Sequence, residues 1–383
     1  MLFIHRDISK HLLKAARSFP SIILTGPRRS GKTFLLKKLF PKAKYFLLED
    51  PNVVSLLRSD PRGFLDDLTG PVIFDELQNF PELLNYIRAL IDAKPSKNGQ
   101  WLMTGSQEAP LMKGVSESMA GRAAVFQLYP FSLHENSKVS FLKGGFPEVV
   151  KKPSIKDIWF RSYIQTYLER DVRSIIAVKD LVTFRKFLSI LASRCGRMLN
   201  KTDIAAPLGI SVATLSQWLG VLESTGQIII VPPFYENFGK RLVKSPKVYF
   251  LDSGLLCHLL EIHNDKMLSE SSFKGAIFEG FAAAEIVKNQ INNGKRKEIY
   301  YFRDEQGLEV DFLVPRANGG LALCEVKSSK TIWPQDIAAM KKLSKGIKSR
   351  PVKCFLITPC TTQLPHLQSV EILSFDHVRA LTE

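Results

Sequence analysis

The sequence predicts an α/β fold, and three observations carry this prediction. A glycine-rich loop of the form G-x-x-x-x-G-K-T at residues 26–33 follows the apolar run 21–25 and precedes residues 34–40, whose apolar positions repeat at helical spacing. Further short apolar runs alternate with helical patterns through the N-terminal third. Two of these runs end in polar clusters, at 75–76 and 104–106. Such alternation is typical of a doubly wound parallel sheet.

The glycine-rich loop has the composition of a phosphate-binding loop. Glycine lets the backbone approach phosphate oxygens, while loop N–H groups and the helix N-terminus direct positive charge toward them. Lys32 can reach the β- and γ-phosphates, and the Thr33 hydroxyl can ligate Mg²⁺. We therefore expect ATP and Mg²⁺ as ligands; the alternative is a glycine-rich turn that binds nothing. The expected nucleotide contacts are Gly26, Pro27, Arg28, Arg29, Ser30, Gly31, Lys32, Thr33 and Phe34.

Two acidic residues end a later strand. After a helix at 10–17 and a strand at 44–48, the run 71–76 predicts a strand that ends in Asp75 and Glu76. After a phosphate-binding loop, this pattern predicts that Asp75 holds Mg²⁺ and that Glu76 polarises the attacking water as general base. The alternative is a pair of solvated acids at a strand end.

The run 100–107 predicts a further strand beside the one that ends in Asp75. Ser106, or less favourably Thr104, can sense the γ-phosphate through a hydrogen bond. The alternative is that Ser106 caps the following helix.

These motifs together resemble the AAA superfamily of ATPases. The resemblance rests on the phosphate loop, the 75–76 pair, the polar tip at 104–106 and the stretch 119–122. Three later stretches are similar to a prokaryotic group of ATP-binding proteins with a C-terminal domain of unknown function: 144–148, 163–172 and 244–255.

The AAA resemblance implies an arginine that completes the ATP site of a neighbouring subunit. Arg122 is the candidate, with a role in stabilising transition-state charge; the alternative is a structural arginine at a helix end. Arg28 and Arg29 are further candidates for phosphate contact. The resemblance thus implies a homo-oligomer, with a hexameric ring as one arrangement.

Residues 136–180, between the ATPase core at 1–135 and the next domain, predict a helical lid over the nucleotide. Trp159, Tyr163, Tyr167 and Arg170 fall on one helical face. We interpret this aromatic stripe as core packing rather than as a ligand platform.

Residues 181–250 predict a winged helix-turn-helix. Helices at 184–192, 201–207 and 212–223, the last capped by Ser211, precede two wing strands. The alternative is a protein-contact module. The strands are 227–231 and 247–250. Expected base contacts are Ser211, Thr214, Ser216 and Gln217, and expected phosphate contacts are Lys240, Arg241, Lys244 and Lys247.

Residues 251–383 predict the element order α-β-β-β-α-β, which resembles the restriction-endonuclease-like fold. Asp311 and Glu325 are expected to ligate Mg²⁺ with the Val326 carbonyl, while Lys327 positions the attacking water. Glu279, on the preceding helix, is the fourth expected acidic position. The alternatives are a former nuclease that has lost cleavage activity and retains only the fold, or a strand pair whose charges are incidental.

The composition favours an acidic polymer as partner. Lys and Arg number 53 against 37 Asp and Glu, a net charge of +16, which favours DNA. The five cysteines form no C-x-x-C pair, which suits a reducing cytoplasm. The N-terminus is not typical of a signal peptide, and no apolar run is long enough for a membrane span, so no membrane association is expected.

The leading hypothesis is an ATP-dependent DNA-processing enzyme with Mg²⁺-dependent nuclease activity. A second hypothesis is an ATP-dependent DNA-binding switch or branch-remodelling motor whose nuclease-like domain only binds. A third is a signalling ATPase that uses its C-terminal modules for protein contacts.

Overall fold

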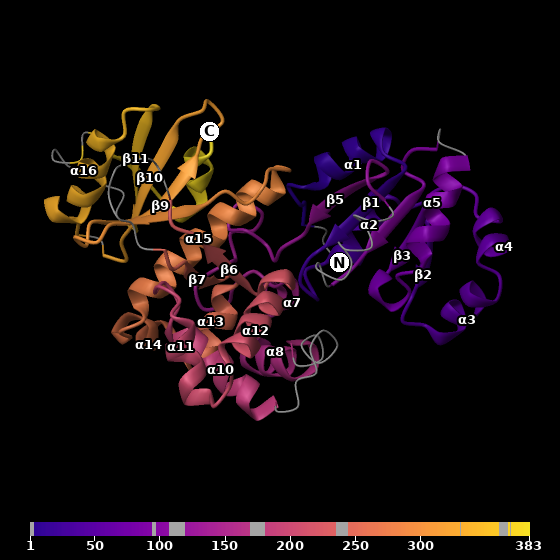
Figure 1. The fold of residues 1–383 in the computed structure, drawn as a ribbon, viewed down its shortest axis with the longest axis horizontal. Helices are drawn as coiled ribbons and strands as arrows, with labels where there is room; N and C mark the ends of the chain where they lie inside the picture. The colour runs from indigo at the N-terminus through magenta and orange to yellow at the C-terminus, as the bar shows by residue number, and fades with distance from the viewer. Residues whose placement is uncertain are drawn as a thin grey trace. The chain divides into compact units, whose positions relative to one another are not determined.

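The computed structural model describes residues 4–93, 97–106, 119–168, 181–234, 244–329, 331–359, 367 and 369–383. The chain divides into two compact units (Figure 1). One unit comprises Met1–Pro130 with the short segments Ser224–Gly226 and Ile291–Lys295. The other comprises Phe131–Glu223, Gln227–Gln290 and Arg296–Glu383.

The first unit contains a five-stranded parallel sheet in the order β2-β3-β4-β1-β5. Ser21 of β1 pairs with both Trp101 of β4 and Ala123 of β5, so the carboxyl ends of the strands share one edge. The predicted pairing of the strand that ends in Asp75 with the next one is confirmed, because β3 pairs with β4. The strands are β1 (Ser21–Thr25), β2 (Lys44–Leu47), β3 (Val72–Asp75), β4 (Trp101–Thr104) and β5 (Ala123–Gln127).

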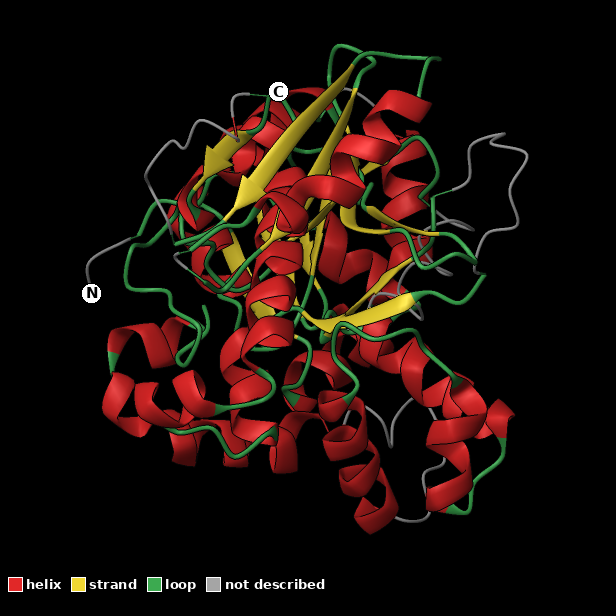
Figure 2. Cartoon of the chain, turned by 90° about the vertical axis from the view of Figure 1, so that its left-hand side faces the viewer, coloured by secondary structure: helices red, strands yellow, loops and turns green. Residues whose placement is uncertain are grey.

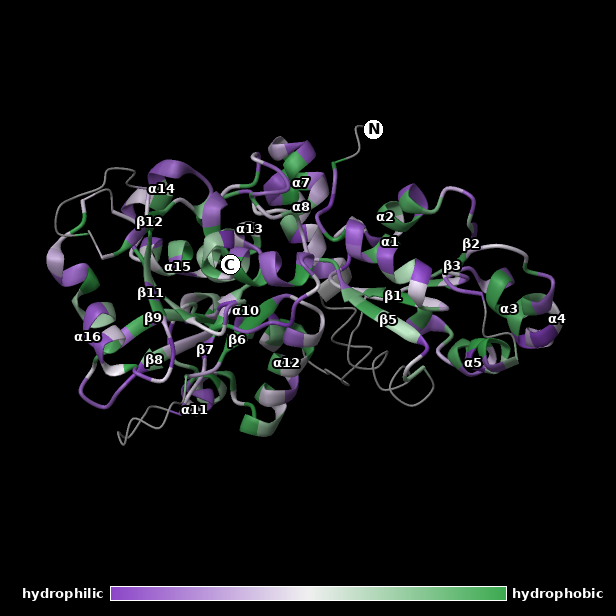
Figure 3. Ribbon diagram, turned by 90° about the horizontal axis from the view of Figure 1, so that it is seen from above, coloured by the Kyte–Doolittle hydropathy of each residue, from purple (hydrophilic) through white to green (hydrophobic). Residues whose placement is uncertain are grey.

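Helices cover both faces of this sheet, as the doubly wound prediction requires. Successive side chains of a strand point to opposite faces. Ile22 and Leu24 of β1 pack with α1 and α2, whereas Ile23 packs with α3, α4 and α5. The strands β1 and β5 are correspondingly mostly hydrophobic, whereas the covering helices carry both hydrophobic and hydrophilic residues (Figure 3). The helices are α1 (Ser9–Ser18), α2 (Lys32–Leu39), α3 (Pro51–Ser59), α4 (Pro61–Asp66) and α5 (Leu83–Ala93).

The second unit begins with helices and a two-stranded antiparallel sheet in the places that the winged-helix prediction requires. Gly209 has φ +64° at the turn, and the Ser211 hydroxyl accepts a hydrogen bond from the Thr214 N–H at 3.0 Å, which confirms the predicted helix start. The elements are α7 (Pro147–Lys151), α8 (Lys156–Tyr163), the π-helix η3 (Ile164–Leu168), α10 (Leu181–Ser193), α11 (Lys201–Ala205), α12 (Val212–Ser224), β6 (Ile228–Val231) and β7 (Lys247–Phe250).

The aromatic stripe predicted on the lid segment is partly described. The Trp159 and Tyr163 rings stack at 4.9 Å, and both lie against Phe146. Tyr163 is buried and Trp159 is half-buried, so both pack against the protein as interpreted; the Tyr167 side chain and Arg170 lie outside the described residues. The position of this segment over the nucleotide stays a prediction.

Two of the stretches that resemble the prokaryotic group, 144–148 and 244–255, contact each other in the second unit. The Asp252 carboxylate accepts hydrogen bonds from the N–H groups of Gly145 and Leu255, at 2.7 and 3.1 Å. A Cβ atom at Gly145 would lie 2.1 Å from the Phe131 carbonyl oxygen. The motif at 144–148 is therefore explained by close backbone packing rather than by chemistry.

The C-terminal part of the second unit is a mixed five-stranded sheet in the order β12-β11-β10-β9-β8, accompanied by α15 and α16. Figure 2 shows the helices of the chain in red and its strands in yellow. The predicted order α-β-β-β-α-β is observed, with a short strand added at the end. The elements are α13 (Ser253–Leu259), α14 (Asp265–Glu270), α15 (Lys274–Asn292), β8 (Tyr300–Arg303), β9 (Glu309–Pro315), β10 (Leu321–Val326), α16 (Ala338–Gly346), β11 (Val352–Ile357) and β12 (Glu371–Leu373).

Among the described residues, no single helix has the length and hydropathy of a membrane span. The consecutive helical segments Lys201–Leu208 and Val212–Ser224, bent by 108° at their junction, reach that threshold only as a pair.

Candidate functional site

The phosphate-binding loop connects β1 to α2 through glycines in the left-handed region. Gly26 has φ +130°, and a Cβ atom there would lie 2.3 Å from the Leu128 carbonyl oxygen. Gly31, with φ +95°, immediately precedes α2. Both positions thus require glycine, and the loop places the first N–H groups of α2 at its centre.

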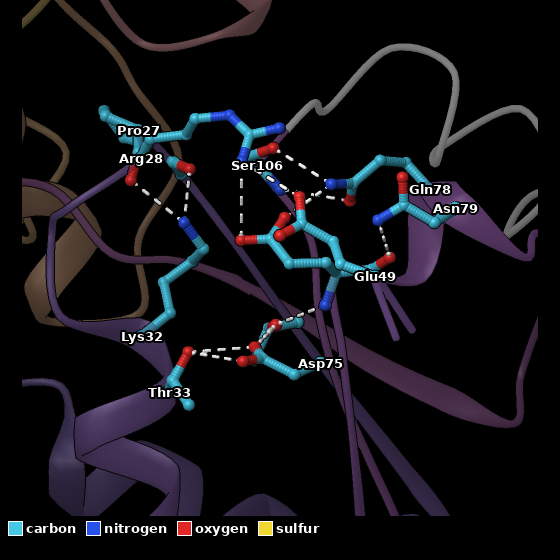
Figure 4. Close-up of polar contacts among 12 residues, drawn as sticks. Pro27, Arg28, Lys32, Thr33, Glu49, Asp75, Gln78, Asn79 and Ser106 are labelled. Carbon is cyan, nitrogen blue, oxygen red and sulfur yellow. Dashed lines mark hydrogen bonds and ion pairs between the residues drawn. The ribbon is translucent and has the colours of Figure 1, made fainter. Parts of the chain in front are cut away.

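Lys32 points into this loop (Figure 4). Its ammonium donates to the carbonyl oxygens of Gly26 and Pro27, each at 2.9 Å, and only 5% of the residue is exposed. Arg6, outside the motif, donates to the Ser30 carbonyl at 3.1 Å. The loop therefore already surrounds a buried positive charge, as binding of a triphosphate requires.

Asp75 is the centre of the polar contacts next to the loop. The Thr33 hydroxyl lies 2.9 Å from both oxygens of its carboxylate, and the Tyr45 hydroxyl donates to one oxygen at 2.8 Å. Thr104 donates to the other, and its hydroxyl also accepts from the Glu76 N–H. Because a hydroxyl and a carboxylate face each other, Thr33 and Asp75 form a suitable ligand pair for Mg²⁺.

Glu76 follows Asp75 with a strained backbone, φ +61° and ψ +52°. Its carboxylate accepts a hydrogen bond from the Gln78 amide and lies 3.9 Å from the Arg28 guanidinium. Burial raises the pKa of this carboxyl, but the Lys32 charge and the Gln78 hydrogen bond outweigh burial, so the net pKa is lowered. Glu76 is therefore charged and oriented, as a general base must be.

Ser106 also belongs to this cluster. The Gln78 side-chain nitrogen lies 3.2 Å from the Ser106 hydroxyl, and the Gln78 side-chain oxygen accepts a hydrogen bond from the Ser106 N–H at 3.4 Å. Gln78 thus forms hydrogen bonds with both Glu76, the predicted general base, and Ser106, the predicted sensor of the γ-phosphate. The helix that Ser106 was expected to cap in the alternative interpretation lies outside the described residues.

The remaining loop residues lie around the same site. Arg28 is buried and lies 3.7 Å from the Glu49 carboxylate, whereas Arg29 has φ +63°. Ser30 is fully buried, and the Phe34 ring is 45% exposed at the start of α2. The predicted nucleotide contacts are thus adjacent in space, and their contact with a nucleotide stays a prediction.

Arg122 does not join this group. It precedes β5, whose far end pairs with the end of β1 beside the loop, so Arg122 lies at the opposite edge of the sheet. Its guanidinium binds the Asp92 carboxylate with two nitrogens, at 2.6 and 3.1 Å. From this position Arg122 cannot reach the phosphate loop of its own chain.

The second unit brings together the carboxylates of the predicted nuclease site. The Val326 N–H donates to the Asp311 carboxylate at 2.8 Å, and Glu325 is buried beside it. The Lys327 ammonium lies 3.7 Å from Glu325 and 3.9 Å from Asp336. Burial and the nearby Asp311 charge raise the pKa of Glu325. The E-x-K pattern and Asp311 are therefore adjacent, as the strand pairing predicted.

The wing prediction is wrong for Lys247. Rather than facing solvent, this residue is 3% exposed, and its ammonium lies 3.0 Å from Glu279 and 2.7 Å from Glu309. The Tyr249 hydroxyl also donates to Glu279. Of the other expected phosphate contacts, Lys244 is exposed, and residues 240 and 241 lie outside the described residues.

Tyr45, Gln78 and Glu309 were not anticipated from the sequence, and Lys247 was assigned to a different role. Gln78 lies two residues after Glu76, and this spacing was a usable signal. The others come from distant strands, and local sequence carries no sign of their contacts.

Three family models match successive parts of the chain. A family model described as AAA domain matches residues 18–137. Two further models, Domain of unknown function (DUF8612) and Domain of unknown function (DUF4143), match residues 135–266 and 274–377. Two solved structures are also similar. The Walker-type ATPase PABY2304 of Pyrococcus abyssi has a TM-score of 0.44, with 16% identity over 67% of this chain and 96% of its own. The Thermotoga maritima RuvB Holliday junction branch migration motor has a TM-score of 0.32, with 16% identity over 59% of this chain and 89% of its own.

Two mycobacterial proteins are similar over most of their length. Uncharacterized protein Rv2008c of Mycobacterium tuberculosis and Uncharacterized protein Mb2031c of Mycobacterium bovis are each 31% identical over 321 residues, which is 82% of this chain and 72% of theirs. With the loop geometry and the domain matches, this similarity shows that the chain belongs to a family of AAA-domain ATPases that carry two further domains of unknown function.

Proposed function

We propose that this protein is an Mg²⁺-dependent ATPase whose nucleotide state controls how its second unit holds DNA. The observation that carries the proposal is the set of contacts around Asp75. The carboxylate faces the Thr33 hydroxyl at 2.9 Å, directly beside the loop that encloses Lys32. This arrangement presents a cation-binding pair and a phosphate-binding ammonium at one edge of the sheet.

The residues of the site divide the chemistry among them. When a triphosphate enters, Lys32 exchanges its two carbonyl acceptors for phosphate oxygens. Glu76, whose pKa is lowered, accepts a proton from the attacking water. Mg²⁺ held by Thr33 and Asp75 would neutralise charge on the β- and γ-phosphates. Loss of the γ-phosphate changes the surroundings of Ser106, and Gln78 connects that change to Glu76.

Charge supports DNA as the partner of the second unit. Residues 337–370 contain six Lys or Arg residues and no acidic residue. Lys342, Lys345 and Lys348 are exposed on and after α16. The exposed positions of α12 carry no charge, so phosphate contact rather than base readout is favoured.

The position of Arg122 supports an oligomer. It lies at the sheet edge opposite its own loop, so it can act only on the nucleotide of a neighbouring copy. We also place the protein in the cytoplasm, because the four cysteines among the described residues are free and buried.

The test combines ATP turnover with DNA binding. Lys32→Ala and Glu76→Gln are both expected to abolish steady-state hydrolysis, while Glu76→Gln retains ATP binding. A panel of duplex, forked, junction and single-stranded DNA, with and without ATP and Mg²⁺, should show affinity that falls steeply with salt. Unchanged turnover in Lys32→Ala refutes the site, and affinity that does not depend on salt refutes the DNA proposal.

One observation favours a second candidate, a signalling ATPase that contacts proteins. Val212, Ala213, Gln217 and Gly220 form an exposed face of α12 without charge, which suits a protein surface. Absence of any DNA affinity in the same panel would select this candidate.

A further inference from the structure

A buried lysine lies among acidic residues of the predicted nuclease site. The Lys247 ammonium, at the start of β7, is 3.0 Å from Glu279 of α15 and 2.7 Å from Glu309 of β9. Its side chain is 4% exposed, and the Tyr301 ring lies 5.4 Å away. A buried ammonium is stable only when carboxylates surround it, and here they are supplied by two other elements, α15 and β9.

These carboxylates belong to the predicted metal cluster. Glu279 is one of its four predicted polar residues, and Glu309 is two residues from Asp311 on β9 and so shares its strand face. Asp311 is among the charges that act on Lys247. The ammonium therefore lies within the cluster, not beside it.

The donor set does not fit a divalent cation. Among the described residues, no three His, Cys, Asp or Glu side chains converge to hold a metal. One oxygen of Glu279 already accepts from Lys247 and Tyr249, Glu309 is also bound by Arg303 at 2.8 Å, and Asp311 accepts from a backbone N–H. A cation at this position would face a fixed positive charge at close range, in surroundings that screen it poorly.

We infer that Lys247 takes the place of the metal, so that the C-terminal domain holds DNA without metal-dependent cleavage. Without this ammonium, the carboxylates of Glu279 and Glu309 lose their cation, and a rearrangement of these side chains lets a divalent ion replace it. The DNA-holding role rests on the proposed function; the exclusion of metal does not.

The test measures Mn²⁺ binding by electron paramagnetic resonance on the full chain without nucleotide or DNA, in an Asp75→Asn background that removes the ATPase ligand. Lys247→Met is compared with the parent chain. Lys288→Met is the matched control, because Lys288 is also buried but contacts only one carboxylate, Glu285, at 3.1 Å. Lys247→Met is expected to show saturable Mn²⁺ binding because a repelling charge is lost, whereas the parent and Lys288→Met show none.

Three results would overturn the inference. One is saturable Mn²⁺ binding by the parent that Asp311→Asn abolishes. The second is Mg²⁺-dependent DNA cutting by the wild type that Lys327→Ala abolishes. The third is a folded Lys247→Met variant that gains no affinity. If this variant does not fold, the first two results still decide whether the inference stands. None of these results depends on ATP turnover, so failure here leaves the ATPase proposal standing.

Discussion

Gln78 is expected to control hydrolysis without contacting the phosphate loop. Its amide nitrogen donates to the Glu76 carboxylate and lies 3.2 Å from the Ser106 hydroxyl (Figure 4). The Glu76 carboxylate also lies 3.9 Å from the Arg28 guanidinium, so Gln78 is one of the groups that set its direction. Replacing Gln78 with Leu keeps a similar volume and removes these two hydrogen bonds and the one that the Gln78 side-chain oxygen accepts from the Ser106 N–H.

The magnitude follows from the contact that is lost. A hydrogen bond to a charged group contributes about 1.5–3 kcal/mol. If that amount is lost from the transition state, kcat falls roughly 10- to 150-fold, at about 1.4 kcal/mol for each factor of ten. The KM for ATP should change little, because Gln78 does not contact Lys32 or Thr33 in the structure.

The assay is steady-state ATP hydrolysis across pH. Gln78 lowers the pKa of Glu76, so its loss should move the acid limb of kcat/KM to higher pH, which a purely structural role would not do. Gln78→Glu should be worse than Gln78→Leu because two carboxylates then face each other. Asn79→Leu is the matched control, because Asn79 donates only to the Glu76 backbone carbonyl, at 3.0 Å. A kcat within about twofold of wild type in a folded Gln78→Leu variant contradicts this reasoning.

Three further outcomes are expected. Mixing equal amounts of inactive Arg122→Ala and inactive Lys32→Ala should restore about a quarter of wild-type turnover. In random mixed oligomers, about one neighbour pair in four combines an intact phosphate loop with an intact Arg122. No recovery of turnover in a verified mixed oligomer contradicts action of Arg122 between subunits. In urea unfolding, Gly145→Ala should lower the free energy of unfolding by roughly 1–3 kcal/mol, because the added methyl clashes with the backbone. Gly275→Ala is the control: a Cβ atom at this helical position would meet nothing within 4 Å, so the free energy of unfolding should rise by about 0.5–1 kcal/mol. Burial and the Asp311 charge raise the pKa of Glu279 from 4.5 to about 7, so its contribution to stability is present below pH 4.5 and lost by about pH 7. Unfolding across this range should show the loss in wild type and not in Glu279→Gln.

The first unit could be predicted in detail because its signals are local. The strand Ser21–Thr25 was predicted with its observed bounds, and the pairing of β3 with β4 followed from motif order alone. Thr33 and Asp75 meet because parallel strands deliver their carboxyl ends to one edge. By contrast, Tyr45 reaches Asp75 from the end strand β2, a contact that depends on strand order and not on any spacing near the motif.

The second unit shows where local patterns fail. A lysine that begins a strand of the form Lys-Val-Tyr-Phe is expected to face water, and this residue was assigned to phosphate contact. Its burial depends on α15 and β9, more than 30 residues further along the chain, which place Glu279 and Glu309 opposite its ammonium.

The same contact explains why the nuclease pattern alone was insufficient. Asp311, Glu325 and Lys327 do meet, so pairing of two neighbouring strands was enough to predict the cluster. Whether such a cluster binds a metal depends on its net charge. The spacing of the acidic residues does not reveal a lysine that another element of the fold brings among them. Burial therefore removes Lys247 from the set of predicted phosphate contacts, and under the proposal made above its ammonium occupies the place of the ion that cleavage requires.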